Sequence, residues 1–303
     1  LAQALALRAG GKEAAAERLL NLLVEENPEN VTAWALLADV LVSRQAFAAV
    51  ERTVVPALRA AAARGVVRGA ALADMTEGSL HLRATPPRPH EARACFLAAL
   101  TNNPPLTAAG GPLLQTDLQL DDIATIEADA LTILRASPGH PAANAVLGSL
   151  RLSQKRYAEA ETNLLQSVAR QPTGGALNDL AELYRKQGRW AEAERQARSA
   201  LRLEPALYQA WDTLGNILLD AGRADEADDS LRCAFAYCPA GDIRPSLTLA
   251  RLRIRQGRTH EARTLLDGLA RQAELLAPAD RSEYDGLLSE SHKSLSRDQQ
   301  TVR

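Results

Sequence analysis

Apolar residues recur along this chain three and four residues apart, the spacing that places side chains on one face of an α-helix. Trp211, Leu214 and Leu218 form one such series, and Ala227 and Leu231 begin the next. No alternation of apolar and polar residues indicates a β-strand. The pattern therefore predicts a chain of paired amphipathic helices.

A short polar pattern opens the second helix of each pair. It starts with Arg, carries Ala and acidic residues at fixed positions, and occupies 156–161, 189–194, 223–228 and 258–263, with a fainter copy at 88–93. Prolines mark the helix ends with spacings of 34, 34, 33 and 34 residues, at Pro104, Pro138, Pro172, Pro205 and Pro239. Proline cannot continue a helix, so each one starts a new repeat. Glycines stand where a left-handed residue ends the first helix, at Gly188, Gly222 and Gly257.

A 34-residue period with these residues resembles the tetratricopeptide repeat (TPR) of bacterial-type tandem arrays. The clearest copy contains Trp211, Leu214, Gly215 and Leu218, followed by Ala227, Leu231, Ala234 and Pro239. Small residues at Gly148, Ala181 and Gly215 let two helix backbones approach closely. The resemblance implies an all-α fold, an α-α superhelix (TPR solenoid), because one helix pair cannot bury its apolar face without stacked neighbours.

We predict a TPR array over 1–277 with about eight repeats, followed by a C-terminal solvating (capping) helix and tail at 278–303. The repeats are placed at 1–30, 31–72, 73–106, 107–140, 141–173, 174–207, 208–242 and 243–277.

The N-terminal half departs from the pattern. Leu80 and Leu114 stand where a small residue is expected. Pro56 is expected to kink or end the helix that contains it. The prolines and glycines of 103–112 predict a loop there, with a helix only from about Leu113 to Leu120.

Composition narrows the class of protein. The chain has 303 residues, 46% of them hydrophobic, and a formal charge of −2 from 35 basic and 37 acidic residues. This balance argues against a nucleic-acid partner. No apolar run is long enough to span a membrane, and three cysteines do not form a disulfide framework. The chain starts at Leu1 without an initiator Met, so we expect a missing upstream segment. A soluble protein of the cytoplasm or the periplasm fits equally, and the localisation stays unknown.

No motif predicts catalysis, a metal or a cofactor. Gly10-Gly11-Lys12-Glu13 lacks the first glycine and the hydroxyl of a phosphate-binding loop. His90-Glu91 and His260-Glu261 lack the second histidine of a zinc site. Cys95 is expected to be a small core residue. We therefore predict a protein that is not an enzyme.

The resemblance implies a concave groove lined by first helices. The groove residues that it predicts are Asn178, Glu182, Arg185, Lys186, Gln209, Asp212, Asn216, Asp220, Arg244, Arg251 and Arg255. Intramolecular pairing of Asp212 and Asp220 with Arg251 and Arg255 is an alternative role for four of them. The lysines that a carboxylate clamp for chaperone tails needs are absent.

The resulting hypothesis is a non-enzymatic scaffold for protein–protein interaction, with a peptide or protein segment bound in the concave groove. One alternative is a self-associating structural array, a homo-oligomer. Another is the non-catalytic TPR portion of a larger enzyme, such as a transferase.

Overall fold

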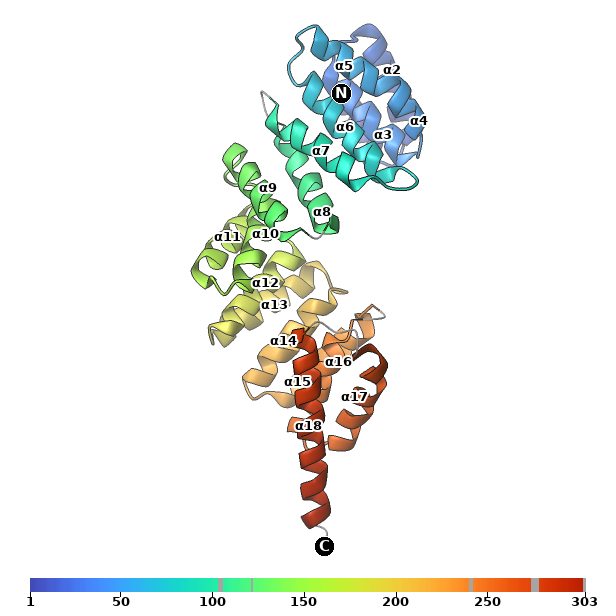
Figure 1. Cartoon of the computed structure of the whole chain (residues 1–303). Helices are drawn as coiled ribbons and strands as arrows, with labels where there is room; N and C mark the ends of the chain where they lie inside the picture. The colour runs from blue at the N-terminus through green and yellow to red at the C-terminus, as the bar shows by residue number, and fades with distance from the viewer. Residues whose placement is uncertain (103–105, 121, 240–241, 274–277, 302–303) are drawn as a thin grey trace. The chain divides into compact units, whose positions relative to one another are not determined.

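The computed structural model describes residues 1–102, 106–120, 122–239, 242–273 and 278–301, and these residues form helices and turns with no β-strand (Figure 1). The all-α prediction is confirmed. The helices belong to two compact units, Leu1–Leu147 and Gly148–Arg303, which we describe separately. None of the described helices is long and apolar enough to cross a lipid bilayer.

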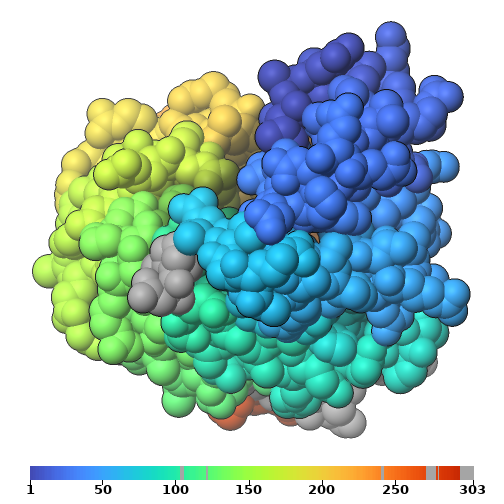
Figure 2. Space-filling view, turned by 90° about the horizontal axis from the view of Figure 1, so that it is seen from above, coloured from blue at the N-terminus to red at the C-terminus, as the bar shows by residue number. Residues whose placement is uncertain are grey.

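The first unit consists of successive antiparallel helices, coloured from blue to green in Figure 1, and their atoms form the blue and green surface of the space-filling view (Figure 2). Its elements are α1 (Ala2–Ala9), α2 (Glu13–Glu26), α3 (Val31–Ser43), α4 (Phe47–Ala49), a π-helical turn η1 (Val50–Val54), α5 (Val55–Ala63), α6 (Gly69–Arg83), α7 (Pro89–Thr101), a 3-10 turn η2 (Thr107–Ala109), α8 (Gly110–Leu120), α9 (Ile123–Ala136) and the start of α10 (Pro141–Ser153).

The second unit begins within α10 and continues the alternation of first and second helices. It contains α11 (Tyr157–Arg170), α12 (Gly174–Lys186), α13 (Trp190–Leu203), α14 (Tyr208–Asp220), α15 (Ala224–Tyr237), α16 (Arg244–Arg255), α17 (Thr259–Ala273) and α18 (Pro278–Thr301). The predicted repeat boundaries and repeat number remain predictions.

Small residues bring the two helices of a hairpin together, as expected. A Cβ atom added to Gly215 of α14 would lie 2.4 Å from Leu231 Cδ2 of α15, and one at Gly148 would lie 2.5 Å from Leu164 Cγ. In the first unit this role belongs to Gly78 of α6, against which the Phe96 ring packs. Leu80, two residues further on, is half-buried in the core that α3 shares.

The turns after first helices are left-handed, as the glycine positions predict. Gly188, Gly222 and Gly257 have φ of 74°, 78° and 72°. Gln45 and Lys155 adopt the same conformation at the corresponding turns, with φ of 60° and 61°. The turn geometry is thus kept where glycine is absent.

Two predictions about irregular segments need correction. Pro56 does not end its helix, because the helical backbone continues from η1 through α5 to Ala63. The disturbance expected at Pro56 takes the form of the π-helical turn η1 in the turn before it. Helix α8 begins at Gly110 rather than near Leu113, with Pro112 in its first turn; residues 103–105 of the expected loop lie outside the described part of the chain.

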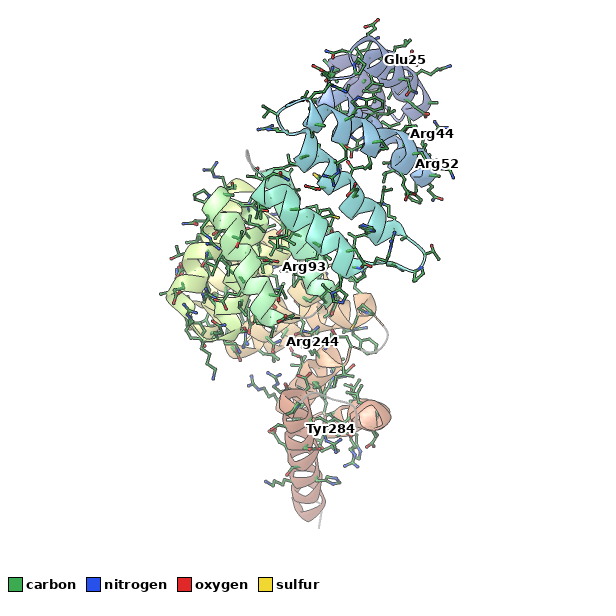
Figure 3. All side chains as sticks on the ribbon, turned by 45° about the horizontal axis from the view of Figure 1, so that its top comes forward. Glu25, Arg44, Arg52, Arg93, Arg244 and Tyr284 are labelled. Carbon is green, nitrogen blue, oxygen red and sulfur yellow. The ribbon has the colours of Figure 1, made fainter. Side chains whose placement is uncertain are left out.

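A buried ion-pair cluster joins three helices of the first unit. Arg93 of α7, labelled in Figure 3, donates from Nε to Asp117 Oδ1 of α8 at 2.9 Å and also pairs with Asp129 of α9. The Asp117 side chain is fully buried. Burial, together with the charge of Asp129, raises the pKa of Asp117 to about 6 despite the arginine. Cys95 of the same helix is only partly buried, so it is not the core residue that we expected.

The recurring Arg-containing pattern forms what we call the arginine–glutamate ladder, in which Arg156, Arg189, Arg223 and Arg258 each hold the glutamate three residues further on. Two of these arginines also reach back to the preceding copy. Arg189 donates to Glu161 at 2.8 Å, and Arg223 donates to Glu194 at 2.6 Å. The polar pattern therefore links consecutive second helices.

The last helix, α18, packs on α16 and α17 through its first half. Tyr284 (labelled in Figure 3) and Leu287 are buried in a core with Leu247 and Leu266. The helix continues to Thr301. It thus covers the apolar face that the α16–α17 hairpin would otherwise expose.

Candidate functional site

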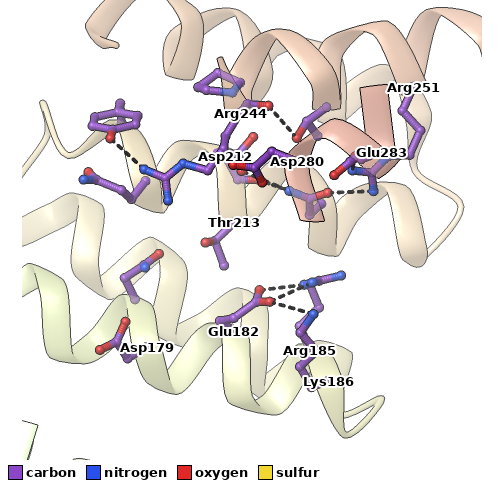
Figure 4. Close-up of a pocket in the computed structure, with 16 residues that line it drawn as sticks. Asp179, Glu182, Arg185, Lys186, Asp212, Thr213, Arg244, Arg251, Asp280 and Glu283 are labelled. Carbon is purple, nitrogen blue, oxygen red and sulfur yellow. Dashed lines mark hydrogen bonds and ion pairs between the residues drawn. The ribbon is translucent and has the colours of Figure 1, made fainter. Parts of the chain in front are cut away.

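The second unit contains a hollow of about 790 Å³, which we call the polar groove. Its walls are α12, α14 and α16, and the first turns of α18 close one end (Figure 4). Its lining residues are Asn178, Asp179, Glu182, Arg185, Lys186, Tyr208, Gln209, Asp212, Thr213, Asn216, Arg244, Pro245, Thr248, Arg251, Asp280 and Glu283.

Nine of the eleven residues predicted from the sequence line this groove, and two do not. Asp220 lies at the end of α14 and accepts a hydrogen bond from Arg185 Nη1 at 2.7 Å. Arg255 lies at the end of α16 and donates to the Leu219 carbonyl at 3.3 Å. The structure thus gathers the predicted residues of three first helices on one surface, and their role as ligand contacts remains a prediction.

The alternative pairing of Asp212 with Arg251 and of Asp220 with Arg255 is wrong. Arg251 pairs with Glu283 of α18, as Figure 4 shows, and also donates to Asn216 Oδ1 at 3.3 Å. Asp220 pairs with Arg185 of the preceding first helix. Arg251 does not pair with Asp212 because α18 brings the Glu283 carboxylate to it, which the sequence did not indicate.

Each basic side chain of the polar groove has a carboxylate partner within the chain. Arg185 forms a two-pronged contact with Glu182, with both N–O distances at 2.7 Å, and Lys186 Nζ lies 3.2 Å from the same carboxylate. Arg244 holds Asp242 and also donates to the Tyr208 hydroxyl at 3.1 Å. The hydrogen bond from Arg244 lowers the pKa of Asp242, and the pKa of Arg244 is raised in turn.

Three buried oxygen atoms of the polar groove lack a hydrogen-bond partner among the described residues: Asn178 Oδ1, Gln209 Oε1 and Asp212 Oδ1. The other Asp212 oxygen accepts from Asn216 Nδ2, at 3.2 Å, and a hydrogen bond from Thr248 also favours the ionised carboxylate. Burial raises the pKa of Asp212 to about 6. Burial also raises the pKa of Asp179, whose partner is the Ser149 hydroxyl. The groove therefore presents acceptors that the chain itself does not satisfy.

Sequence reasoning missed seven lining residues, for two reasons. Asp280 and Glu283 belong to α18, to which we had assigned only a covering role. The rest lie beside predicted positions on the same helices, at Asp179, Tyr208, Thr213, Pro245 and Thr248. Thr248 could have been predicted from the sequence, because it lies one turn from Arg244 on the same helical face.

The described residues contain no group of three or more His, Cys, Asp or Glu side chains placed to hold a metal ion. A second, smaller hollow of about 420 Å³ lies in the first unit, beside His81. The polar groove is the larger of the two and contains the predicted residues.

Comparison with known proteins identifies the repeat. The tetratricopeptide repeat profile matches residues 178–231. The cellulose synthase operon protein C of Xanthomonas axonopodis pv. citri is 37% identical over 147 residues, which are 44% of this chain. The chain spans only 9% of the length of that relative.

Solved structures share the fold at low identity. A chain of the APC/C hetero-tetramer Cut9-Hcn1 is 14% identical with a TM-score of 0.60, over 82% of this chain and 48% of that one. Pseudomonas aeruginosa PilF is 17% identical with a TM-score of 0.56, over 73% and 97%. PilW, a type IV pilus biogenesis factor, is 17% identical with a TM-score of 0.56, over 72% of this chain and 98% of that one. The repeat spacing and the profile match identify tetratricopeptide repeats within this chain, and the solved structures share its helical solenoid fold.

Proposed function

We propose that this chain is a non-enzymatic interaction module whose polar groove binds an extended segment of a partner protein. The observation that carries the proposal is the set of three buried acceptors without donors, on Asn178, Gln209 and Asp212. A buried polar atom left without a hydrogen bond costs free energy, which an incoming donor recovers. An extended peptide supplies such donors along its backbone.

Two of these side chains are amides, which suit a peptide backbone. Each amide carries an acceptor oxygen and a donor NH₂ group, so it can match the C=O and N–H of one peptide unit. Asn178 and Gln209 lie on different first helices, α12 and α14, which pack against each other. A segment that crosses both helices would meet both amides.

The fold supports the same proposal by analogy. A chain of this fold belongs to the APC/C hetero-tetramer Cut9-Hcn1, where it assembles with a protein partner. The analogy covers the fold and not the ligand.

The proposal is tested by selecting binders from a displayed library of random peptides with the full chain as bait. We expect the selected peptides to lose affinity for the double variant Asn178→Ala, Gln209→Ala. A matched control is Gln166→Ala, which removes an exposed amide from α11. Selected peptides that bind the double variant as well as the parent protein would place the ligand elsewhere.

A second candidate rests on the alignment with the cellulose synthase operon protein C. It favours a role as the TPR part of a larger protein that serves cellulose synthesis. The test is whether the immobilised full chain captures purified protein products of a cellulose synthase operon. Capture that does not exceed that by the double variant Asn178→Ala, Gln209→Ala contradicts this candidate. Self-association remains the further alternative, and sedimentation of the purified chain decides it.

A further inference from the structure

The basic and the acidic side chains of the polar groove differ in whether they have a charged partner within the chain. Its arginines and its lysine are each held by a carboxylate of the chain, so an acidic ligand would have to displace an existing partner. Asp179 and Asp212, in contrast, accept hydrogen bonds from neutral side chains alone, Asp179 from Ser149 and Asp212 from Asn216 and Thr248. The unmet demand in the groove is therefore for positive charge and for hydrogen-bond donors.

We infer that the polar groove takes a basic side chain of its peptide partner, a lysine or an arginine, against Asp212, and that Asn178 and Gln209 accept further hydrogen bonds from the same segment. The inference rests on the proposed function and names the chemistry of the ligand. Ammonium and guanidinium groups carry several donors and no acceptor, which matches a site made of acceptors. Hydrogen bonds between such a cation and a carboxylate are also stronger than those between neutral groups.

The positions of the three residues allow one ligand to reach them all. Gln209 and Asp212 are three residues apart on α14, so they share one helical face. Asn178 holds on α12 the place that Asp212 holds on α14, 34 residues earlier. Neighbouring side chains cover the three oxygens in the free protein, but the terminal torsions of Asn, Asp and Gln side chains are soft and can turn an oxygen toward a donor.

The surroundings of Asp212 make the contact sensitive to pH. The charged residues that line the same groove are Asp179 and Glu182 of α12, Arg244 and Arg251 of α16, and Asp280 and Glu283 of α18. Burial raises the pKa of Asp212 to about 6, against a hydrogen bond from Thr248 and the attraction of the two arginines. The carboxylate is thus mostly ionised at neutral pH and protonated near pH 5, where it no longer attracts a cation. A bound cation would favour the ionised form, so binding releases protons between these pH values.

The experiment uses peptides selected from the random library, labelled with fluorescein, and the full chain. Fluorescence anisotropy gives their affinity for the parent protein, for Asp212→Asn and for the control Asp229→Asn, which removes an exposed carboxylate of α15. Each peptide is also made with its basic residue replaced by glutamine, and with lysine and arginine exchanged. Asp212→Asn removes a charge that burial already disfavours, so we expect the variant to fold, which thermal melting followed by circular dichroism checks.

We expect enrichment of lysine or arginine at one peptide position. We also expect a loss of about tenfold or more for Asp212→Asn and for the glutamine peptide, with little further loss when both changes are combined. Asp229→Asn should bind as the parent does, and affinity should fall from about pH 7.5 to about pH 5 only when Asp212 is present.

Exchange of lysine and arginine shows which cation the site prefers, and either preference supports the inference. Peptides that bind in the groove but carry no basic residue, or whose basic residue is insensitive to Asp212→Asn, overturn the inference and leave the proposed function standing. If no selected peptide depends on Asn178 and Gln209, the proposed function fails as well.

Discussion

The close approach of α14 and α15 can be tested by adding a single methyl group. In Gly215→Ala the new Cβ would lie 2.4 Å from Leu231 Cδ2 and 2.5 Å from its Cγ. Carbon atoms pack at about 3.5–4.0 Å, so the fully buried leucine must move by about 1 Å or change its rotamer. We therefore expect this hairpin to lose packing energy in the variant.

The expected magnitude is a balance of two terms. Overpacking of a core costs about 1–3 kcal/mol. Replacing glycine by alanine within a helix returns about 1 kcal/mol. The net destabilisation is then about 0–2 kcal/mol. Gly268→Ala on α17 isolates the second term, because no atom lies within 4 Å of the added Cβ, and we expect it to stabilise the protein by about 1 kcal/mol.

The assay is denaturant unfolding of the full chain followed by circular dichroism. The two alanine variants should differ by about 1–3 kcal/mol in the unfolding free energy of the second unit, with Gly215→Ala the less stable. Leu231→Ala alone should cost about 2–5 kcal/mol, and in that background Gly215→Ala should become stabilising because its methyl group fills the space left by the leucine. If Gly215→Ala stabilises the parent protein as much as Gly268→Ala does, the close-packed assignment is refuted.

Three further predictions concern charge and turns. The folded pKa of Asp117, about 6, lies above the ordinary value of 3.8. Its ionisation therefore opposes folding, and the stability of Asp117→Asn relative to the parent should increase as the pH rises from about 4 through 6; a pH-independent difference in urea titrations contradicts this. Asp212→Asn should behave in the same direction, and a variant that melts well below the parent at pH 7 would show that the carboxylate stabilises the fold. Gly222→Ala should cost about 1 kcal/mol, because its φ of 78° disfavours a side chain although no atom lies within 4 Å of the added Cβ; thermal melting at unchanged temperature would argue against a left-handed turn.

Local signals in the sequence were enough for the helices and for most of the groove. Prolines and glycines act within one turn of the chain, so the ends of the helices around Gly188 and Gly222 could be placed from them. The faces of α12, α14 and α16 follow from helical spacing, which is why Asn178, Asp212 and Arg251 were found together.

What could not be predicted depends on contacts between distant residues. Glu283 reaches Arg251 only because α18 folds back on α16, and no local pattern specifies that. The repeat spacing placed the small residue of this hairpin at the position of Leu80. In the structure Gly78, two residues earlier, packs against the Phe96 ring instead. Lys155 shows the converse, a left-handed turn that neighbouring structure imposes on a residue without intrinsic preference for it.

The arginine–glutamate ladder has a consequence for how such a chain changes in length. In two copies the first residue binds the last residue of the copy before it, as Arg189 binds Glu161 and Arg223 binds Glu194. A duplicated copy therefore carries both the arginine that binds the preceding copy and the glutamate that the following copy binds, so its neighbours need no change. Lineages can gain or lose hairpins along this edge while the opposite surface, where Asn178 and Asp212 lie, diversifies independently.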